Sequence, residues 1–300
     1  MTRPSYQWRL RGRELAMGPR TLVMGILNVT PDSFSDGGRF LSTDAALAHA
    51  LEMLDEGADI IDIGGESTRP GAKVGESGVS ADEELRRIVP VIRGVLRERS
   101  GTLISVDTYK SEVVRAAAGA GAEIVNDVSA LGWDSLMPGT VRELECGVIL
   151  MHSRGRPEEW RRQPASPDIV VEVKNDLRAW AAAAVSAGIA YDRLVLDPGF
   201  GFGKNFDQNY PLLARFGELH ELGFPLLSGT SRKSFIGRTL ERDHQDAPAE
   251  ARLYGTLATV TASVLQGAHI VRVHDVKPAV EAVKVADAII SAANIANTHE

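Results

Sequence analysis

The sequence alternates, over nearly its whole length, between short apolar runs and longer segments with helical spacing of apolar residues. Eight runs are expected to be strands: Thr21–Leu27, Ile60–Ile63, Leu103–Val106, Ile124–Val125, Val148–Met151, Leu194–Leu196, Pro225–Leu227 and Ile270–Val273. Most are apolar throughout, which is typical of parallel strands that are buried on both faces. This alternation indicates an α/β fold with a parallel sheet.

The segments between the runs are expected to be amphipathic helices. Leu47, Leu51 and Leu54 fall on one face of the first of them, and similar spacing recurs in later segments. Eight strands with about eight helices and no linker, in 300 residues, predict a (β/α)8 TIM barrel. A doubly wound open sheet has the same local pattern and is the alternative. Residues 1–19 are expected to form a short N-terminal extension, as a cover or hairpin, and residues 20–300 the barrel domain.

Charge and cysteine content exclude several classes of protein. The chain has 33 Lys and Arg against 40 Asp and Glu, a net charge of −7, so it is not expected to bind nucleic acid generally. A single cysteine, Cys146, excludes an intrachain disulfide framework and a multi-cysteine zinc site. No apolar run approaches the ~20 residues of a membrane span, and no signal-peptide core follows the N-terminal arginines. A cytoplasmic protein without membrane partners is expected.

Each expected strand ends in polar or glycine residues, and in a barrel these ends form the active-site face. The endings are Asn28, Gly64–Glu66, Asp107, Asn126-Asp127, His152, Asp197, Ser228–Lys233 and Arg272–His274. Asp107, Asn126 and Asp197 would face one cavity from three strands. Their acceptors suit a flat heterocycle with adjacent N–H and NH2 groups. For any one of them alone, helix capping is the alternative.

A local basic cluster predicts an anionic substrate group. Ser231–Ser234 precedes an expected helix, and Arg272 and His274 follow the last strand. The loops after strands seven and eight of a TIM barrel frequently hold a phosphate; a solvated surface patch is the alternative. Two long polar loops, 28–40 and 65–80, are also expected to be functional, because such loops are uncommon in compact domains.

Two further features have competing interpretations. The glycine-rich run Pro198–Lys204 does not fit a P-loop, because Pro198 stands where a glycine is needed and Asn205 where Ser or Thr is needed. Its glycines are expected instead to allow close approach of the backbone to a ligand. His152 is either a ligand-site residue or a core histidine with its hydrogen bonds satisfied.

Taken in order, the motifs resemble those of the dihydropteroate synthase family. The matching segments run from about Thr21 to His274: 24–38, 57–71, 104–108, Asn126-Asp127, Met151-His152, 196–204, 229–235 and 272–275. The resemblance implies a TIM barrel that joins p-aminobenzoate to 6-hydroxymethyl-7,8-dihydropterin diphosphate, giving 7,8-dihydropteroate and pyrophosphate in folate biosynthesis. It also implies Mg2+ as cofactor and a homodimer.

The resemblance also implies roles for individual residues. The pterin site would comprise Asp107, Asn126, Asp197 and Lys233. The diphosphate site would comprise Asn28, Arg272 and His274, with Asn28 also a Mg2+ ligand. Contacts to diphosphate or p-aminobenzoate would come from Thr68, Arg69 and Ser234, and the walls of the p-aminobenzoate pocket from Phe34, Pro70, Phe202 and Lys233. The expected catalytic set is Asp107, Asp197, Lys233, Arg272 and His274.

The chain departs from the family pattern at Ser153–Pro157, where many members carry Met-Gln-Gly-x-Pro, so no role is transferred to that loop. The charged segment Arg238–Arg252 is assigned no role. Two other functions remain open: a pterin-dependent methyltransferase of the same fold, and a catalytically silent pterin-binding paralogue. The intact segments 66–70 and 32–36 favour an active enzyme over the silent paralogue.

Overall fold

Eight parallel strands form the central sheet of the protein. A computed structural model describes residues 3–30, 39–67, 74–75 and 78–297. The strand order is β8-β7-β6-β5-β4-β3-β10-β9, and a parallel bridge between Leu196 and Leu226 closes the sheet into a barrel. The strands are β3 (Leu22–Asn28), β4 (Ile60–Gly64), β5 (Leu103–Asp107), β6 (Ile124–Asp127), β7 (Gly147–Met151), β8 (Leu194–Asp197), β9 (Leu227–Ser228) and β10 (Ile270–Val273). The predicted TIM barrel is confirmed.

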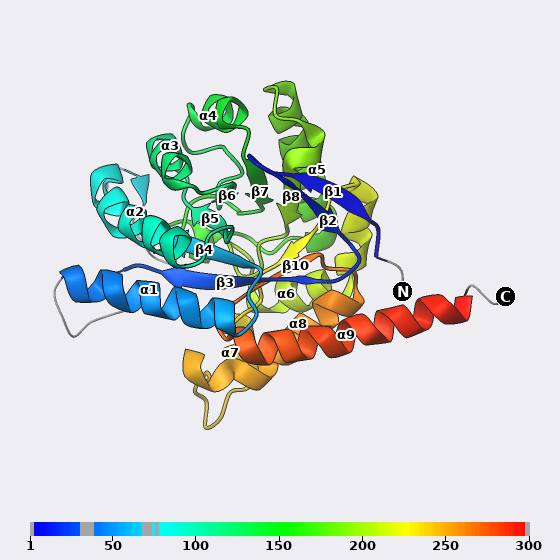
Figure 1. Cartoon of the computed structure of the whole chain (residues 1–300). Helices are drawn as coiled ribbons and strands as arrows, with labels where there is room; N and C mark the ends of the chain where they lie inside the picture. The colour runs from blue at the N-terminus through cyan, green and yellow to red at the C-terminus, as the bar shows by residue number, and fades with distance from the viewer. Residues whose placement is uncertain (1–2, 31–38, 68–73, 76–77, 298–300) are drawn as a thin grey trace.

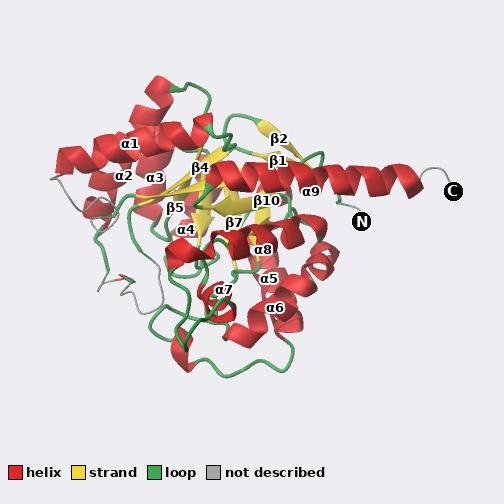
Figure 2. Ribbon diagram, turned by 90° about the horizontal axis from the view of Figure 1, so that it is seen from below, coloured by secondary structure: helices red, strands yellow, loops and turns green. Residues whose placement is uncertain are grey.

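Helices surround the barrel (Figures 1 and 2). They are α1 (Arg39–Asp55), α2 (Ala81–Glu98), α3 (Ser111–Ala120), α4 (Met137–Leu144), α5 (Ile169–Ser186), α6 (Phe206–Ala214), α7 (Ser234–Thr239), α8 (Leu253–Leu265) and α9 (Val276–Asn297), with 3-10 turns at Trp160–Arg162, Tyr191–Arg193, Phe216–Leu222 and Ala249–Arg252. Local capping sets several boundaries: Asp168 accepts hydrogen bonds from two amides at the start of α5, and Gly121 ends α3 at a φ of 114°. Helix α9 runs along α8 and extends past the barrel (Figure 1).

The strands contribute alternate side chains to two apolar cores. In β4, Ile61 and Ile63 join the cluster between the sheet and the helices, whereas Ile60 joins a second cluster inside the barrel. The inner cluster takes at least one residue from every strand: Leu22, Met24, Ile60, Leu103, Ile124, Ile149, Val195, Leu227 and Ile270. Both faces of the strands are therefore buried, which explains their apolar sequences.

An N-terminal hairpin covers the end of the barrel where the strands begin. Strands β1 (Tyr6–Arg9) and β2 (Glu14–Met17) pair antiparallel, and Trp8, Leu10 and Met17 of this segment pack into the inner cluster. The indole of Trp8 donates a hydrogen bond to the carbonyl of Arg193, just before β8. This plug fills one end of the barrel with apolar side chains, which leaves the opposite end for polar chemistry.

Two further features concern the helices and the single cysteine. None of the helices in the described ranges combines the length and apolarity that a membrane span needs. Cys146 is buried, and burial raises the pKa of its thiol to about 11. It is therefore an inert packing residue.

Candidate active site

The alternation that builds the inner core also directs polar side chains into the barrel near the carboxyl ends of the strands. Two residues after Ile60 comes Asp62, and two after Ile124 comes Asn126. The same parity holds for the polar residues Asp197 and Arg272 and for the apolar Met151, which follow inner-core residues of their own strands. The strands thus change from apolar to polar along their inner faces, and the polar layer lies opposite the N-terminal plug.

Arg272 of β10 lies at the centre of this layer. Its Nε donates to Asp62 Oδ2 at 2.6 Å, and one terminal nitrogen donates to Asp107 Oδ2 at 2.6 Å. Asn126 Nδ2 donates to the same Asp62 oxygen at 2.9 Å. Burial would lower the pKa of the Arg272 guanidinium, but Asp62 and Asp107 more than offset it, so the pKa is raised. One guanidinium thereby links the inner faces of β4, β5 and β10.

Of the two predicted pterin-site aspartates, Asp197 is buried and Asp107 is partly buried, with its side chain 20% exposed. Burial raises the pKa of Asp107 to about 7, with Arg272 opposing the shift. Burial also raises the pKa of Asp197, opposed by the Gly199 N–H, which donates to Asp197 Oδ1 at 2.7 Å, and by Lys233. Such shifts are common at functional sites, because charged groups are concentrated there out of contact with water.

Lys233 comes directly before α7 and faces the same cavity. Its Nζ lies 3.8 Å from the centroid of the Phe202 ring. Burial and the nearby Arg272 lower its pKa to about 7, while Asp197 and Asp107 oppose the shift. An amine on an aromatic face among carboxyl groups is a polar contact for a ligand rather than a solvated surface charge.

These side chains line one small cavity at the carboxyl end of the barrel, of about 30 Å³. The lining is Asp107, Asn126, Val128, Met151, Asp197, Phe200, Phe202, Gly229, Lys233 and Arg272. The structure therefore brings together all four residues predicted for the pterin site, with Phe202 and Arg272 beside them. A cavity of this size holds about one water molecule, so a ring-sized ligand requires side chains such as Arg272 to move.

A second, wider groove adjoins the barrel mouth and contains Asn28 and His274. Its volume is about 420 Å³. The hydroxyl of Ser231 lies 3.0 Å from His274 Nδ1 and accepts from the His274 N–H at 3.1 Å. Burial and the surrounding cations, Arg272 first, lower the pKa of His274 to about 3, so the imidazole is neutral at pH 7. Asn28 and His274, which were predicted for the diphosphate site, thus share a groove that is separate from the cavity lined by the predicted pterin-site residues.

The basic cluster predicted at Ser231–Ser234 is divided by the fold. Arg232 forms a two-pronged ion pair with Asp275, at 2.5 and 2.9 Å. Lys233 instead lines the first cavity, and Ser234 is exposed at the start of α7. The Arg232 side chain has a carboxylate partner and also lines the wider groove, so the fold places Arg232 and Lys233 in different pockets.

Four of the predicted contact residues cannot be described. Phe34, Thr68, Arg69 and Pro70 lie outside the residues that the structure describes. Within the described ranges, no group of three or more His, Cys, Asp and Glu side chains is placed to hold a metal ion. Asn28, the residue predicted as a Mg2+ ligand, lies at the end of β3 in the wider groove.

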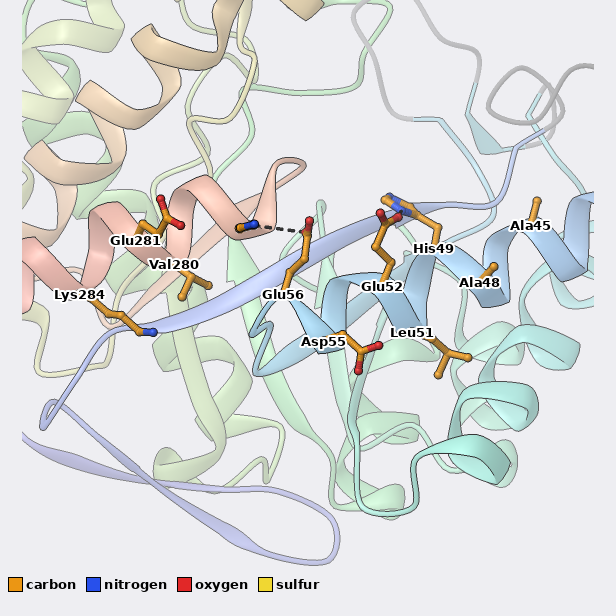
Figure 3. A pocket seen from close by; sticks show the side chains of 11 residues that line it. Ala45, Ala48, His49, Leu51, Glu52, Asp55, Glu56, Val280, Glu281 and Lys284 are labelled. Atoms are coloured by element: carbon orange, nitrogen blue, oxygen red, sulfur yellow. Dashed lines mark hydrogen bonds and ion pairs between the residues drawn. The ribbon is translucent and has the colours of Figure 1, made fainter.

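Another groove lies between α1 and α9 (Figure 3). It has a volume of about 1070 Å³ and mixed charge, with Glu52, Glu281 and Lys284 among its lining residues. Glu56 accepts a hydrogen bond from the Lys277 N–H at 3.3 Å across it. None of the predicted site residues lines this groove, which shares His49, Glu52 and Glu56 with the wider groove that contains Asn28 and His274.

Sequence reasoning missed Asp62, Met151 and Phe200. Asp62 is fully buried in the middle of a strand, and it organises both Arg272 and Asn126. Its position two residues after Ile60 is a signal that it points into the barrel. Met151 ends an ordinary apolar run, so spacing alone distinguishes it weakly from a core residue. Phe200 lies in the glycine-rich run Pro198–Lys204, where the sequence analysis assigned a ligand approach to the glycines and not to the aromatic side chains.

Comparisons with known proteins agree with this geometry. The profile of the family described as "Pterin binding enzyme" matches residues 24–274. Dihydropteroate synthase from Escherichia coli K12 is 48% identical over 270 residues, covering 90% of this chain and 92% of that protein. The Bacillus subtilis enzyme of that name is 46% identical over 277 residues, covering 92% and 91%.

Solved structures give the same result. Dihydropteroate synthase from Xanthomonas albilineans, solved with 4-aminobenzoic acid, has a TM-score of 0.86 and 44% identity, covering 95% of this chain and 98% of that one. The Yersinia pestis enzyme, solved with a sulfonamide drug complex, has a TM-score of 0.85 and 44% identity, covering 95% and 99%. The chain belongs to the dihydropteroate synthases of the pterin-binding enzyme family.

Proposed function

We propose that this chain catalyses the condensation of 6-hydroxymethyl-7,8-dihydropterin diphosphate with p-aminobenzoate, which gives 7,8-dihydropteroate and pyrophosphate. The observation that carries the proposal is the convergence of Asp107, Asn126, Asp197 and Lys233 on one buried cavity at the barrel mouth. The family membership supports it, because relatives with this name cover more than nine tenths of this chain and of their own length.

The chemistry of the cavity suits the pterin ring. The amino-pyrimidine edge of a dihydropterin presents adjacent N–H and NH2 donors, for which carboxylates are matched acceptors. Asn126 donates through Nδ2 to Asp62, which leaves its Oδ1 free to accept from the ring. Lys233 supplies a donor for a ring nitrogen or carbonyl. Asp62 thus serves the pterin site indirectly, by fixing the orientation of the Asn126 amide.

The reaction replaces a carbon–oxygen bond with a carbon–nitrogen bond. Diphosphate leaves with the bonding electron pair, and the methylene carbon becomes cationic in conjugation with the pterin ring. Asp107 and Asp197 stabilise this cation by fixed electrostatics, because their carboxylates lie around the ring before reaction. The amine of p-aminobenzoate then attacks and loses one proton to water. Since that amine is neutral at pH 7, positioning contributes more than base catalysis.

The diphosphate is proposed to bind between Arg272 and the wider groove, with Asn28 and His274. The Ser231 hydroxyl next to Nδ1 favours a proton on Nε2 of neutral His274, which can donate to a phosphate oxygen. Asn28 offers one amide oxygen, which fits Mg2+ held mainly by diphosphate oxygens and water. Mg2+ would contribute neutralisation of the diphosphate charge. Catalytic roles are proposed for Asp107, Asp197, Lys233, Arg272 and His274.

The p-aminobenzoate site is proposed at the outer rim of the cavity. Phe202 and Lys233 form its described part, with the N-terminus of α7 at Ser234 beside them. Phe34, Thr68, Arg69 and Pro70 are proposed to complete it. A homodimer in the cytoplasm is proposed as the working form, supported by family resemblance; light scattering of the purified protein tests the dimer.

Product analysis tests the proposed function. The enzyme is incubated with dihydropterin diphosphate, Mg2+ and p-aminobenzoate, and dihydropteroate is measured by mass spectrometry. We expect product with the wild type, and a loss of at least about a hundredfold in the Asp107→Ala and Asp197→Ala variants, which retain the fold. No product, together with methyl transfer from methyltetrahydrofolate to a corrinoid protein, would support the methyltransferase alternative. Pterin binding without either reaction would support a silent paralogue.

A further inference from the structure

Lys204 is a buried basic residue that does not line the pterin cavity, and burial lowers the pKa of its amine to about 7. It is 7% exposed and follows the glycine-rich loop 198–203 after β8. Its Nζ donates to the Gly199 carbonyl at 2.7 Å and to His152 Nδ1 at 2.9 Å. Longer contacts, both of 3.3 Å, reach the carbonyls of His152 and Phe202. One amine therefore joins the end of β7 to both halves of the loop.

The surroundings of His152 favour its Nδ1 as the acceptor of the hydrogen bond from Lys204. It is fully buried, its ring stacks on Trp180 of α5, and its Nε2 lies 3.1 Å from Asp176 Oδ2 on the same helix. Burial and the adjacent Lys204 lower the pKa of His152 to about 4, so the ring is neutral. Asp176 favours the proton on Nε2, which leaves the Nδ1 lone pair for Lys204. This arrangement decides between the two interpretations of His152: it is a buried partner, not a ligand-site residue.

The loop that Lys204 holds carries three features of the pterin cavity. Phe200 and Phe202 line the cavity, and the Gly199 N–H donates to Asp197 Oδ1. Gly199 has a φ of 63°, and a Cβ there would lie 1.9 Å from the His152 carbonyl oxygen. The close backbone approach expected of these glycines is therefore, at Gly199, to the neighbouring strand end and not to a ligand. A small displacement of Lys204 would therefore move the aromatic side chains that line the cavity and the Gly199 N–H that donates to Asp197.

We propose that Lys204 is a positioning residue, which acts with its acceptor His152 to hold the loop 198–203, and with it Asp197 and Phe202, in the geometry that pterin binding needs. The inference rests on the proposed function, since it concerns the same cavity. The positioning acts through the loop backbone and does not require Lys204 to touch substrate.

The test compares Lys204→Met with a matched control, Arg193→Met. Arg193 is also a buried basic residue that donates to a backbone carbonyl, that of Leu10 at 3.0 Å, but it lies at the opposite end of β8. For each variant, three quantities are measured: the affinity of a non-reactive pterin by calorimetry, the thermal unfolding temperature, and hydrogen exchange of the amides of residues 199–203.

We expect Lys204→Met to weaken pterin binding at least about tenfold and to speed exchange in the loop. Arg193→Met should lose stability while keeping the wild-type affinity within about twofold. Asp176→Asn, a milder change at a partly exposed site, should weaken binding several-fold, and it provides the test if Lys204→Met does not fold. Unchanged affinity in both Lys204→Met and Asp176→Asn, or equal weakening in Arg193→Met, would overturn the inference.

The design separates this inference from the proposed function. If the wild type binds no pterin, the proposed function fails, and the exchange rates of the unliganded variants still decide whether Lys204 holds the loop. If the wild type binds and the loop amides of Lys204→Met exchange as slowly as those of the wild type, the positioning role is wrong and the proposed function stands.

Discussion

Asp62 offers a sharp test of how the polar layer works, because it is fully buried and lies beneath the proposed pterin contacts. Its Oδ2 accepts from Arg272 Nε and Asn126 Nδ2, while its Oδ1 is buried without a hydrogen-bond partner among the described residues. Asp62→Asn keeps the shape and removes the charge. In this variant Asp107 is the remaining close carboxylate partner of Arg272. A pterin must then displace a stronger interaction between Arg272 and Asp107 before it can bind Asp107.

The magnitude follows from the contacts. A hydrogen bond to a charged group is worth about 1.5–3 kcal/mol, and about 1.4 kcal/mol is tenfold in affinity. Pterin affinity should therefore fall between about tenfold and a hundredfold. The fold should also lose about 1–3 kcal/mol of stability, because a neutral amide replaces the charged acceptor of a buried Arg272 hydrogen bond.

Asp127 provides a control that should lose stability without losing pterin affinity. It is equally buried on β6, but among the described residues its carboxylate accepts from its own loop alone, from Ser129 N, Ser129 Oγ and Leu131 N. Asp127→Asn should cost about 1–3 kcal/mol of stability and leave pterin affinity unchanged. Calorimetry and urea unfolding measure the two effects. Wild-type affinity in Asp62→Asn, or an affinity loss that simply follows stability in both variants, would refute this reasoning.

Three further predictions concern pH, the plug and inhibition. Because burial raises the pKa of Asp107 to about 7, the carboxyl gains a proton as pH falls, and calorimetry from about pH 8 to about pH 5.5 should show pterin affinity decreasing; a flat profile would contradict this. Trp8→Ala should cost about 3–5 kcal/mol in urea unfolding, with kcat unchanged, because Trp8 is fully buried at the far end of the barrel; a loss under about 1 kcal/mol would contradict it. Sulfonamides, one of which is bound in the Yersinia pestis relative, should raise the apparent KM for p-aminobenzoate without lowering kcat, and a lowered kcat would argue against a shared pocket.

The barrel was predictable because its signal is local. Apolar runs and amphipathic segments identify strands and helices without knowledge of tertiary contacts. The predicted strands ended too early at Val106, Val125 and Leu196, because the following polar residues remain in the ladder. Asp107, for example, pairs with Gly64 on one side and Asn126 on the other. The polar side chains show where the mouth of the barrel begins, but the backbone hydrogen bonds between the strands continue past that point.

Side-chain pairing between distant segments was less predictable. Arg232 has a φ of 55°, and its side chain pairs with Asp275, whereas the next residue, Lys233, faces the cavity. Arg252, in a segment to which the sequence assigned no role, donates to the Arg232 carbonyl at 2.8 Å and so supports this turn. Spacing cannot reveal these partners, because Arg252 and Asp275 come from the distant segments just before α8 and α9.

A crystal structure of the protein with a bound pterin analogue tests the central claim most directly. The account predicts that the ring lies at the barrel mouth, with its N–H and NH2 edge on Asp107, Asn126 and Asp197, and that Arg272 moves away from Asp107 to make room. A ring bound elsewhere, for instance in the groove between α1 and α9, or a ring at the mouth without contacts to these three side chains, would contradict it.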